Sequence, residues 1–289
     1  MPRILVTGAS GFIGQALCES LHELNVNFLG TDLVPQSTSV LKIDVTDPIS
    51  LRIILDFKPD VVVHLAAQVD VSKSFIDPIS DLQSNILGTL NLLQAAATSG
   101  AKNFVYISSG GAIYGENEIG PTSEHSNLDL KSPYGISKLA GEFYVKVLSE
   151  RYGLAWSSLA LSNCYGSVTR CKKGVIYNFW EKLSRGERPT INGSQTSRDF
   201  IHVSDVTKAI HLAITKPTSC RVNISTAKET SLIDLYAIIS KQMGVQIEPI
   251  IGKLDTGEVA QSCLDNSLAE SLLGWKPKIG IEDGIRLAI

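Results

Sequence analysis

Apolar and polar residues follow two alternating patterns along the first half of the chain. Short, nearly continuous apolar runs are followed by longer stretches in which apolar residues recur every three or four positions. The short runs predict buried strands and the longer stretches predict amphipathic helices. The predicted strands cover residues 4–6, 27–31, 61–65 and 104–108, and the predicted helices cover residues 13–24, 49–57, 81–99 and 134–152. This alternation predicts an α/β fold with a Rossmann-type, doubly wound parallel sheet.

The regular alternation ends at about Tyr165, where loops and shorter elements follow. We therefore predict two domains, a nucleotide-binding domain over residues 1–164 and a smaller C-terminal substrate-binding lobe over residues 165–289. Residues 198–213 have the pattern of a strand and a helix, and the sequence leaves open that this segment returns to the first domain.

Three glycines spaced three apart follow the first predicted strand directly. Gly8 allows a tight turn, Gly11 allows the backbone to approach a pyrophosphate, and Gly14 allows the next helix to pack closely on the sheet. That helix begins near Phe12 and Ile13, so its N-terminus would face the phosphates. A glycine-rich turn without a ligand is the alternative for such a triplet taken alone.

Asp32 ends the second predicted strand, about 18 residues after Gly14, where dinucleotide-binding folds place an acidic residue. A carboxylate there accepts hydrogen bonds from the adenosine ribose and repels a 2′-phosphate. No Arg or Lys follows until Lys42. The sequence therefore predicts NAD rather than NADP as the cofactor.

Tyr134 and Lys138 lie four residues apart in the last predicted helix of the first domain, so they share one face. A phenol has an ordinary pKa of about 10, and a neighbouring ammonium favours its phenolate. Tyr134 can then remove a proton from a hydroxyl as hydride leaves the same carbon. Such a pair is common on solvated helices, but the preceding dinucleotide pattern favours a catalytic role.

The chain has 26 basic and 29 acidic residues and a formal net charge of −3, so we predict no nucleic-acid partner. The short charged stretch Lys172-Lys173 and the single charge of Asp81 are predicted to lie on solvated faces. No signal peptide or membrane-spanning segment is evident, which predicts a cytoplasmic protein without a membrane partner. The five cysteines are scattered, and neither disulfides nor a metal site are expected.

Several motifs occur in one order along nearly the whole chain. They are Gly8-x-x-Gly11-x-x-Gly14, Asp44-Val45-Thr46-Asp47, His64-Leu65-Ala66-Ala67, Tyr134-x-x-x-Lys138, Arg198-Asp199-Phe200-Ile201-His202-Val203 and Leu273-Gly274-Trp275-x-Pro277. With these motifs the sequence resembles the extended short-chain dehydrogenase/reductase family. Within it, the chain is most similar to NAD-dependent nucleotide-sugar epimerases and dehydratases, especially UDP-glucose 4-epimerases.

The resemblance implies roles for individual residues. For the cofactor, it implies contacts from Asp44 and Val45 to adenine, a groove lined by Leu65, Ala66 and Ala67, and further contacts from Asn85, Ser108 and Leu161. For a nucleotide-diphosphate sugar substrate, it implies diphosphate contacts from Asn163 and Arg198, and base contacts from Val175, Thr190 and Ile191. It also implies a homodimer formed through the helices at residues 81–99 and 134–152. A surface ion pair with Asp199 is the alternative for Arg198. His64 and His202 are expected to be structural.

The chain departs from the family pattern in several places. Gly110 stands where family members carry a catalytic Ser or Thr, so Ser109 is expected to supply the hydroxyl, with Ser108 less favoured. Gly111-Ala112 replaces the Asp-Glu pair of the dehydratases and the Glu of related decarboxylases, which argues against both reactions. Ala160 and Asp255 stand where cations are expected near the diphosphate.

The sequence therefore predicts 4-epimerisation of a nucleotide-activated hexose through a transient 4-keto sugar, with Tyr134, Lys138 and Ser109 as the catalytic residues. A 4-keto nucleotide-sugar reductase or dehydrogenase is the alternative enzyme. A non-catalytic NAD-binding regulatory protein is the alternative from another class, but it would need neither Tyr134 nor Lys138.

Overall fold

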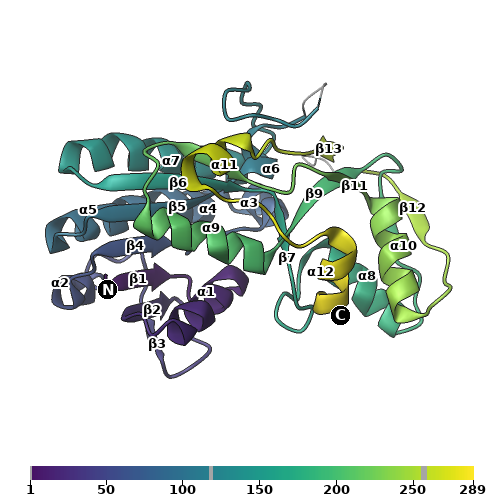
Figure 1. Cartoon of the computed structure of the whole chain (residues 1–289), viewed down its shortest axis with the longest axis horizontal. Coiled ribbons are helices and arrows are strands. Elements are labelled where there is room, and N and C mark those ends of the chain that lie inside the picture. The colour runs from purple at the N-terminus through teal and green to yellow at the C-terminus, as the bar shows by residue number, and fades with distance from the viewer. Residues whose placement is uncertain (1, 117–119, 255–258) are drawn as a thin grey trace.

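A parallel seven-stranded sheet forms the centre of the larger part of the molecule (Figure 1). The structure, a computed structural model, describes residues 2–116, 120–254 and 259–289. The strand order is β10-β6-β5-β4-β1-β2-β3. The strands are β1 (Ile4–Thr7), β2 (Phe28–Asp32), β3 (Val40–Lys42), β4 (Val61–His64), β5 (Asn103–Ser109), β6 (Ala155–Leu161) and β10 (Arg221–Ile224). The predicted α/β fold is confirmed, with the strand order of dinucleotide-binding folds at its centre.

Helices cover both faces of this sheet because its strands are apolar on both faces. Ile4 and Val6 of β1 pack in one layer and Leu5 between them packs in the other. The first layer contains α1 (Phe12–Glu23), α9 (Val203–Thr215) and α11 (Ser267–Leu273). The second layer contains α2 (Arg52–Phe57), α5 (Gly88–Ser99) and α7 (Pro133–Tyr152). Strands buried on both faces explain the continuous apolar runs in the sequence.

The predicted helix over residues 81–99 begins earlier than expected and has three parts. Its first part is α4 (Pro78–Leu82), capped by the Asp77 carboxylate, which accepts from Ser80 N at 3.0 Å. The π-helical turn η1 (Gln83–Leu87) follows and leads into α5. A π-turn adds one residue to the turn and displaces the side chains around it. The predicted helix over residues 49–57 begins only at Arg52.

The prediction that Asp81 lies on a solvated face is wrong. Its side chain is only 1% exposed, because α4 packs against α3 (Val71–Ile76) and against α7. A single charge in the sequence indicates solvent exposure only when no other element covers it. Here the covering helices come from more distant parts of the chain.

A smaller part of the molecule surrounds a second apolar core. Its helices are α8 (Gly174–Ser184), α10 (Leu232–Met243) and α12 (Ile281–Ala288). Its strands are β7 (Asn163–Tyr165), β8 (Thr190–Asn192), β9 (Ser197–His202), β11 (Glu229–Ser231), β12 (Ile250–Gly252) and β13 (Gln261–Ser262). β9 pairs with β7, β11 and β13, and β8 pairs with β12.

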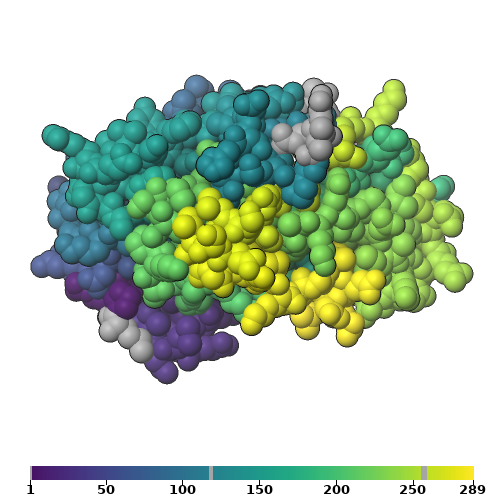
Figure 2. Space-filling view, turned by 45° about the horizontal axis from the view of Figure 1, so that its top comes forward, coloured from purple at the N-terminus to yellow at the C-terminus, as the bar shows by residue number. Residues whose placement is uncertain are grey.

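The chain passes more than once between the two parts. After β9, α9 packs on α1 and β5 in the first helix layer, and β10 then joins the edge of the central sheet. After α11, residues 274–280 run along the surface to α12 in the smaller part, within the yellow region of Figure 2. This segment is held by Asp205 of α9, whose carboxylate accepts from Lys278 N and Ile279 N at 2.9 Å each. The division into two domains at residue 165 stays a prediction. β10 and α11 follow residue 165 in the chain and pack with the central sheet.

In the described residues, no helix combines the length and the apolar character that a membrane span requires.

Candidate active site

The glycine turn leaves no room for side chains. Gly8 has φ +69°, and a Cβ on Gly8 would lie 2.7 Å from Ala66 N. A Cβ on Gly14 would lie 2.0 Å from Gly8 O. Gly11 is the N-cap of α1 and makes no side-chain capping bond. The first backbone N–H groups of α1 are therefore suited to an anion such as a pyrophosphate, which fits a dinucleotide at this edge of the sheet.

Asp32 lies beside this turn at the end of β2. Its Oδ2 accepts a hydrogen bond from Ser10 N at 2.9 Å, and its Oδ1 accepts from Val34 N at 3.0 Å. The two contacts hold a partly exposed carboxylate next to the glycine loop. Each carboxylate oxygen keeps a free lone pair, so Asp32 can accept further hydrogen bonds from hydroxyl groups.

Other predicted cofactor residues lie along the same sheet edge. Leu65 and Ala66 continue from β4, where their N–H groups donate to Thr7 O and Thr7 Oγ1 at 3.2 and 3.3 Å. Ala67 follows in the same loop. The Asp44 side chain is held by a local turn, in which Thr46 N and Thr46 Oγ1 donate to Asp44 Oδ1 at 2.8 and 2.7 Å. Val45 packs against Gly88, where a Cβ would lie 2.6 Å from Val45 Cγ2.

Asn85 projects from the π-helical turn into a buried hydrogen-bond network. Its Oδ1 accepts from Gln68 N at 2.8 Å, and its Nδ2 donates to Ser137 Oγ at 3.0 Å and Asp81 Oδ1 at 3.2 Å. The amide thus connects η1, the loop after β4 and α7, the helix that carries Tyr134 and Lys138.

The two histidines predicted to be structural are hydrogen-bonded within the fold. His64 Nδ1 and Nε2 contact Thr7 Oγ1 and Thr89 Oγ1 at 2.8 and 3.0 Å. Burial and the nearby Lys138 lower the pKa of His64 to about 3. His202 caps α9 by accepting from Ser204 N at 3.3 Å. Both histidines therefore make the hydrogen bonds that a structural role predicts.

Tyr134 and Lys138 are both buried on one face of α7. The helix begins with Ser132, whose Oγ accepts from Gly135 N at 3.1 Å, and with Pro133 in the first turn. Burial raises the pKa of Tyr134 to about 12, and a hydrogen bond with the Ser109 side chain opposes this shift. Burial lowers the pKa of Lys138 to about 7, against the opposing effects of Glu142 and Asp81. A phenol in this setting needs added positive charge nearby before it can act as a base near neutral pH.

Tyr134 opens onto a cavity of about 270 Å³. The cavity joins the start of α7 to the ends of β5 and β6 and to the smaller part of the molecule. Its lining includes Ser109, Leu161, Asn163 and Arg198, all of which were predicted site residues. The lining residues that sequence reasoning missed are Val69, Val71, Lys131, Ser132, Ser162, Val259 and Ser262. Gly111 and Ala112, which replace the acidic residues of related enzymes, also line the cavity.

Some of the missed lining residues carried a usable signal. Ser132-Pro133 is a typical helix start, so the placement of Ser132 beside Tyr134 could have been found. Ser162 adjoins the predicted Asn163. Ser262 and Val259 carry no local signal, because they reach the cavity only through the return of a distant segment. Asp255, where a departure from the family pattern was noted, lies outside the described residues.

Ser109 and Ser108 occupy different environments at the end of β5. Ser109 lines the cavity, whereas Ser108 is buried and its Oγ has no hydrogen-bond partner in the described part of the chain. At Gly110, a Cβ would lie 2.3 Å from Leu264 Cδ1, and Leu264 is itself buried. Leu264 fills the room that a side chain at residue 110 would need. Of the two serines, Ser109 is the one that lines the cavity with Tyr134.

Arg198 points its guanidinium toward the cavity from β9. Its Nη1 donates to Ser197 O and Ala260 O at 2.8 and 2.9 Å. The neighbouring Asp199 is fully buried, and its carboxylate accepts from Thr226 Oγ1 at 2.7 Å and Ala227 N at 3.0 Å. A surface ion pair, the alternative weighed for Arg198, does not describe such a buried carboxylate.

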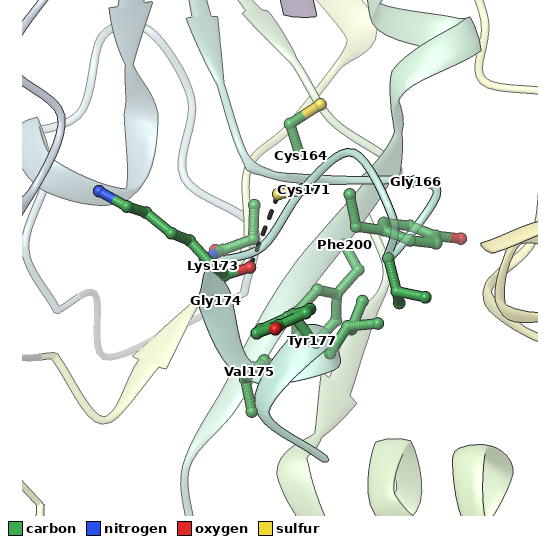
Figure 3. Close-up of a pocket in the computed structure, with 12 residues that line it drawn as sticks. Cys164, Gly166, Cys171, Lys173, Gly174, Val175, Tyr177 and Phe200 are labelled. Carbon is green, nitrogen blue, oxygen red and sulfur yellow. Dashed lines mark hydrogen bonds between the residues drawn. The ribbon is translucent and has the colours of Figure 1, made fainter. Parts of the chain in front are cut away.

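A second, smaller cavity of about 70 Å³ adjoins the first through Asn163, which lines both. Figure 3 shows residues that line this smaller cavity. Val175 and Tyr177 come from the start of α8 and lie on one side, near Phe200 of β9. Thr190 and Ile191 line neither cavity. Thr190 is exposed on β8, and Ile191 is fully buried in the second core.

Comparisons with known proteins agree with this geometry. The family model of the NAD dependent epimerase/dehydratase family matches residues 4–225. A UDP-glucose 4-epimerase of Mycolicibacterium smegmatis is 34% identical over 98% of this chain and 96% of its own length. The crystal structure of a UDP-glucose 4-epimerase of Thermotoga maritima with UDP-glucose has a TM-score of 0.94 and 34% identity, covering 99% of this chain and 97% of that one.

A UDP-glucose 4-epimerase of Thermus thermophilus, in complex with NAD, has a TM-score of 0.92 and 32% identity, covering 99% of this chain and 97% of that one. The predicted NAD cofactor and the predicted enzyme class are thereby confirmed. The chain belongs to the NAD-dependent epimerase/dehydratase family, as an NAD-dependent nucleotide-sugar epimerase.

Proposed function

We propose that this enzyme interconverts UDP-glucose and UDP-galactose by inversion at C4 of the sugar. The observation that carries the proposal is the single cavity that joins Tyr134 and Ser109 to Asn163 and Arg198. One end offers a base and a hydroxyl, and the other offers an amide and a guanidinium suited to a diphosphate. UDP-glucose 4-epimerases with similar sequence and structure support UDP as the nucleotide.

The residues of the glycine turn would hold NAD. In this proposal the N-terminus of α1 binds the pyrophosphate, Asp32 accepts from the adenosine ribose, and Asp44 and Val45 lie at adenine. The loop of Leu65, Ala66 and Ala67, together with Asn85, Ser108 and Leu161, lies along the rest of the cofactor. When bound there, NAD would supply a reversible hydride acceptor for the sugar carbon. The unpartnered Ser108 Oγ supports a polar ligand at this position.

Tyr134 acts as the base in this proposal, and Lys138 supplies the positive charge that favours its phenolate. Ser109 donates a hydrogen bond to the same sugar oxygen and holds it beside the phenol. Asn163 and Arg198 hold the diphosphate while the 4-keto sugar rotates, so that its opposite face can receive the hydride. Val175 and the pocket at the start of α8 support the uracil side of the substrate, whereas the roles predicted for Thr190 and Ile191 stay predictions.

Gly111 and Ala112 argue against elimination or decarboxylation in the same cavity. Neither residue can donate or accept a proton through a side chain, and both line the cavity beside Ser109. A one-way 4-keto reductase remains the alternative enzyme, and it would exchange its cofactor with solution at each turnover.

The test is to incubate the purified enzyme with UDP-galactose and follow UDP-glucose by proton NMR. We expect conversion to a constant ratio from either sugar, without added NAD. NAD released on denaturation should be close to one molecule per chain. No conversion with UDP-sugars, but turnover of another nucleotide sugar, would overturn the choice of substrate. Dependence on added NADH would favour the reductase.

Asp32 is expected to set cofactor choice. Wild-type protein freed of cofactor should bind NAD at least about tenfold more tightly than NADP. The Asp32 carboxylate accepts hydrogen bonds from the adenosine ribose of NAD and repels the 2′-phosphate of NADP. Asp32→Ala should narrow this ratio, while Asp56→Ala, at an exposed site on α2, should not. Calorimetric titration of both cofactors measures the ratio, and equal affinities in the wild type would contradict the role of Asp32.

We also propose a homodimer through the predicted helices over residues 81–99 and 134–152, together with the adjoining α3. α7 exposes Ile136, Phe143 and Val147, and the adjoining α3 and α4 expose Ile76 and Ile79. Neighbouring exposed apolar side chains of this kind are typical of an interface between copies. The predicted cytoplasmic location stays a prediction.

Charge placed on this face should separate the copies. The double variant Phe143→Glu, Val147→Glu is expected to sediment as a monomer where the wild type sediments as a dimer. Leu24→Glu, an exposed apolar position at the end of α1, serves as the control and should leave the dimer intact. A monomeric wild type, or a dimeric double variant, would contradict this interface.

A further inference from the structure

Asp81 is a buried carboxylate that the proposed reaction does not use. Its Oδ1 accepts from Gln68 Nε2 at 2.9 Å and from Asn85 Nδ2 at 3.2 Å. Both donors are neutral amides. Among the ion pairs that the structure describes, none includes Asp81, although the side chain is only 1% exposed. Burying a carboxylate without a cation is costly, so its presence calls for a reason.

A short hydrogen-bond path joins Asp81 to the catalytic turn of α7. Asn85 Nδ2 donates to both Asp81 Oδ1 and Ser137 Oγ, the second at 3.0 Å. Ser137 Oγ in turn donates to Tyr134 O at 3.0 Å. Ser137 lies between Tyr134 and Lys138 in the sequence, so the path ends within the turn that carries both groups.

Other charged or titratable groups also face Lys138. Tyr134 and Glu142 lie on its own helix, Tyr106 faces it from β5 and His64 from β4. The Lys138 Nζ lies 4.2 Å from the centre of the Tyr106 ring.

Glu142 differs from Asp81 in having a cation partner. Arg221 Nη2 lies 2.6 Å from Glu142 Oε1, and Ser158 Oγ donates to Glu142 Oε2 at 2.8 Å. The charge of Glu142 is therefore largely balanced by Arg221, whereas that of Asp81 is balanced by no cation among its described partners.

We propose that Asp81 is a positioning residue whose link through Asn85 and Ser137 holds the Tyr134–Lys138 turn in register and whose negative charge, together with that of Glu142, favours the ammonium form of Lys138. This inference rests on the roles proposed for Tyr134 and Lys138. Asp81 raises the pKa of both Tyr134 and Lys138 because a nearby carboxylate disfavours a phenolate and favours an ammonium. Asp81 therefore shifts the pKa of both groups in the same direction.

Asp81→Asn removes the charge and keeps the shape and the acceptor oxygen. Both limbs of the plot of kcat against pH should then move to lower pH, by about one pH unit. Gln68→Leu is the matched control, because it removes a neutral donor from the same carboxylate and leaves the charge. A purely structural role would disturb both variants alike and would leave both limbs in place.

The experiment compares kcat for UDP-galactose against pH in wild type, Asp81→Asn and Gln68→Leu. The inference is supported if both limbs of the pH profile shift from their wild-type positions in Asp81→Asn and not in Gln68→Leu. It is overturned if the limbs of Asp81→Asn stay at the wild-type pH values. If Asp81→Asn does not fold, Asp81→Ser, which is smaller and also neutral, carries the same expectation.

A second readout needs no turnover. Tyrosinate absorbance is titrated with pH in the protein with and without NAD, and the same titration of Tyr134→Phe is subtracted. The Tyr134 transition should lie at lower pH in Asp81→Asn than in wild type, whichever nucleotide sugar is the substrate. An unchanged transition overturns the inference alone, whereas an active Tyr134→Phe enzyme would overturn the proposed role of Tyr134.

Discussion

Tyr134→Phe is expected to lower kcat for UDP-glucose epimerisation by a factor of about 10² to 10⁴. The change removes the hydroxyl that accepts the substrate proton and almost no volume, so the packing around the buried ring is kept. NAD affinity should stay close to that of the wild type, because the glycine turn and Asp32 are untouched. Single-turnover and steady-state rates measure the effect on the chemical step.

Tyr144→Phe is the control for this prediction. Tyr144 lies on the same helix but is exposed. Its loss of a hydroxyl should leave kcat unchanged, so an equal decrease in both variants would point to a disturbed helix. A Tyr134→Phe enzyme with a nearly normal kcat would contradict the assignment of Tyr134 as the base.

Arg198→Ala is expected to raise KM for the nucleotide sugar about 30-fold, which corresponds to roughly 2 kcal/mol. A guanidinium that contacts a diphosphate makes charge-assisted hydrogen bonds, and these are stronger than neutral ones. Arg198→Lys should lie between wild type and Arg198→Ala, because it keeps the charge and loses the forked geometry. Measurements at fixed ionic strength keep screening constant.

Arg188→Ala is the matched control in the smaller part of the molecule. Arg188 is exposed, lines neither cavity, and donates through Nε to Glu248 O at 2.8 Å. Its removal should leave KM unchanged. Because Arg198 also donates to Ser197 O and Ala260 O, the melting temperature of Arg198→Ala is measured alongside. An unchanged KM in a stable Arg198→Ala protein would place the diphosphate elsewhere and weaken the substrate proposal.

The departure at Gly110 illustrates how far local sequence can carry the assignment of a site. The sequence leaves Ser109 and Ser108 as the candidate hydroxyls, because a strand alternates its side chains and its register in the sheet is not visible locally. The structure separates them because Ser109 lines the cavity of Tyr134, whereas Ser108 is buried away from it. Leu264, which lies far along the chain, fills the room beside Gly110. No pattern near Gly110 could have indicated that contact.

The sequence by itself determined the features that depend on neighbours along the chain. Gly8 and Gly14 stand where the turn has no room for a side chain, and Tyr134 and Lys138 share a face because one helical turn separates them. Apolar runs such as Val61–Val63 indicated a sheet covered on both faces, and that sheet is observed. Such features follow from backbone sterics and from periodicity, which a short segment carries within itself.

Only the tertiary structure decided which distant segments meet. It buried Asp81 beneath α3 and α7, brought Arg198 and Ser262 to the cavity of Tyr134, and returned β10 to the edge of the central sheet. These outcomes depend on close packing between elements far apart in sequence, and a charge or a serine looks the same in the sequence whether or not another element covers it. The electrostatic environment of Lys138 is therefore in part a property of the assembled fold, since its burial and the nearby Asp81 depend on elements other than its own helix.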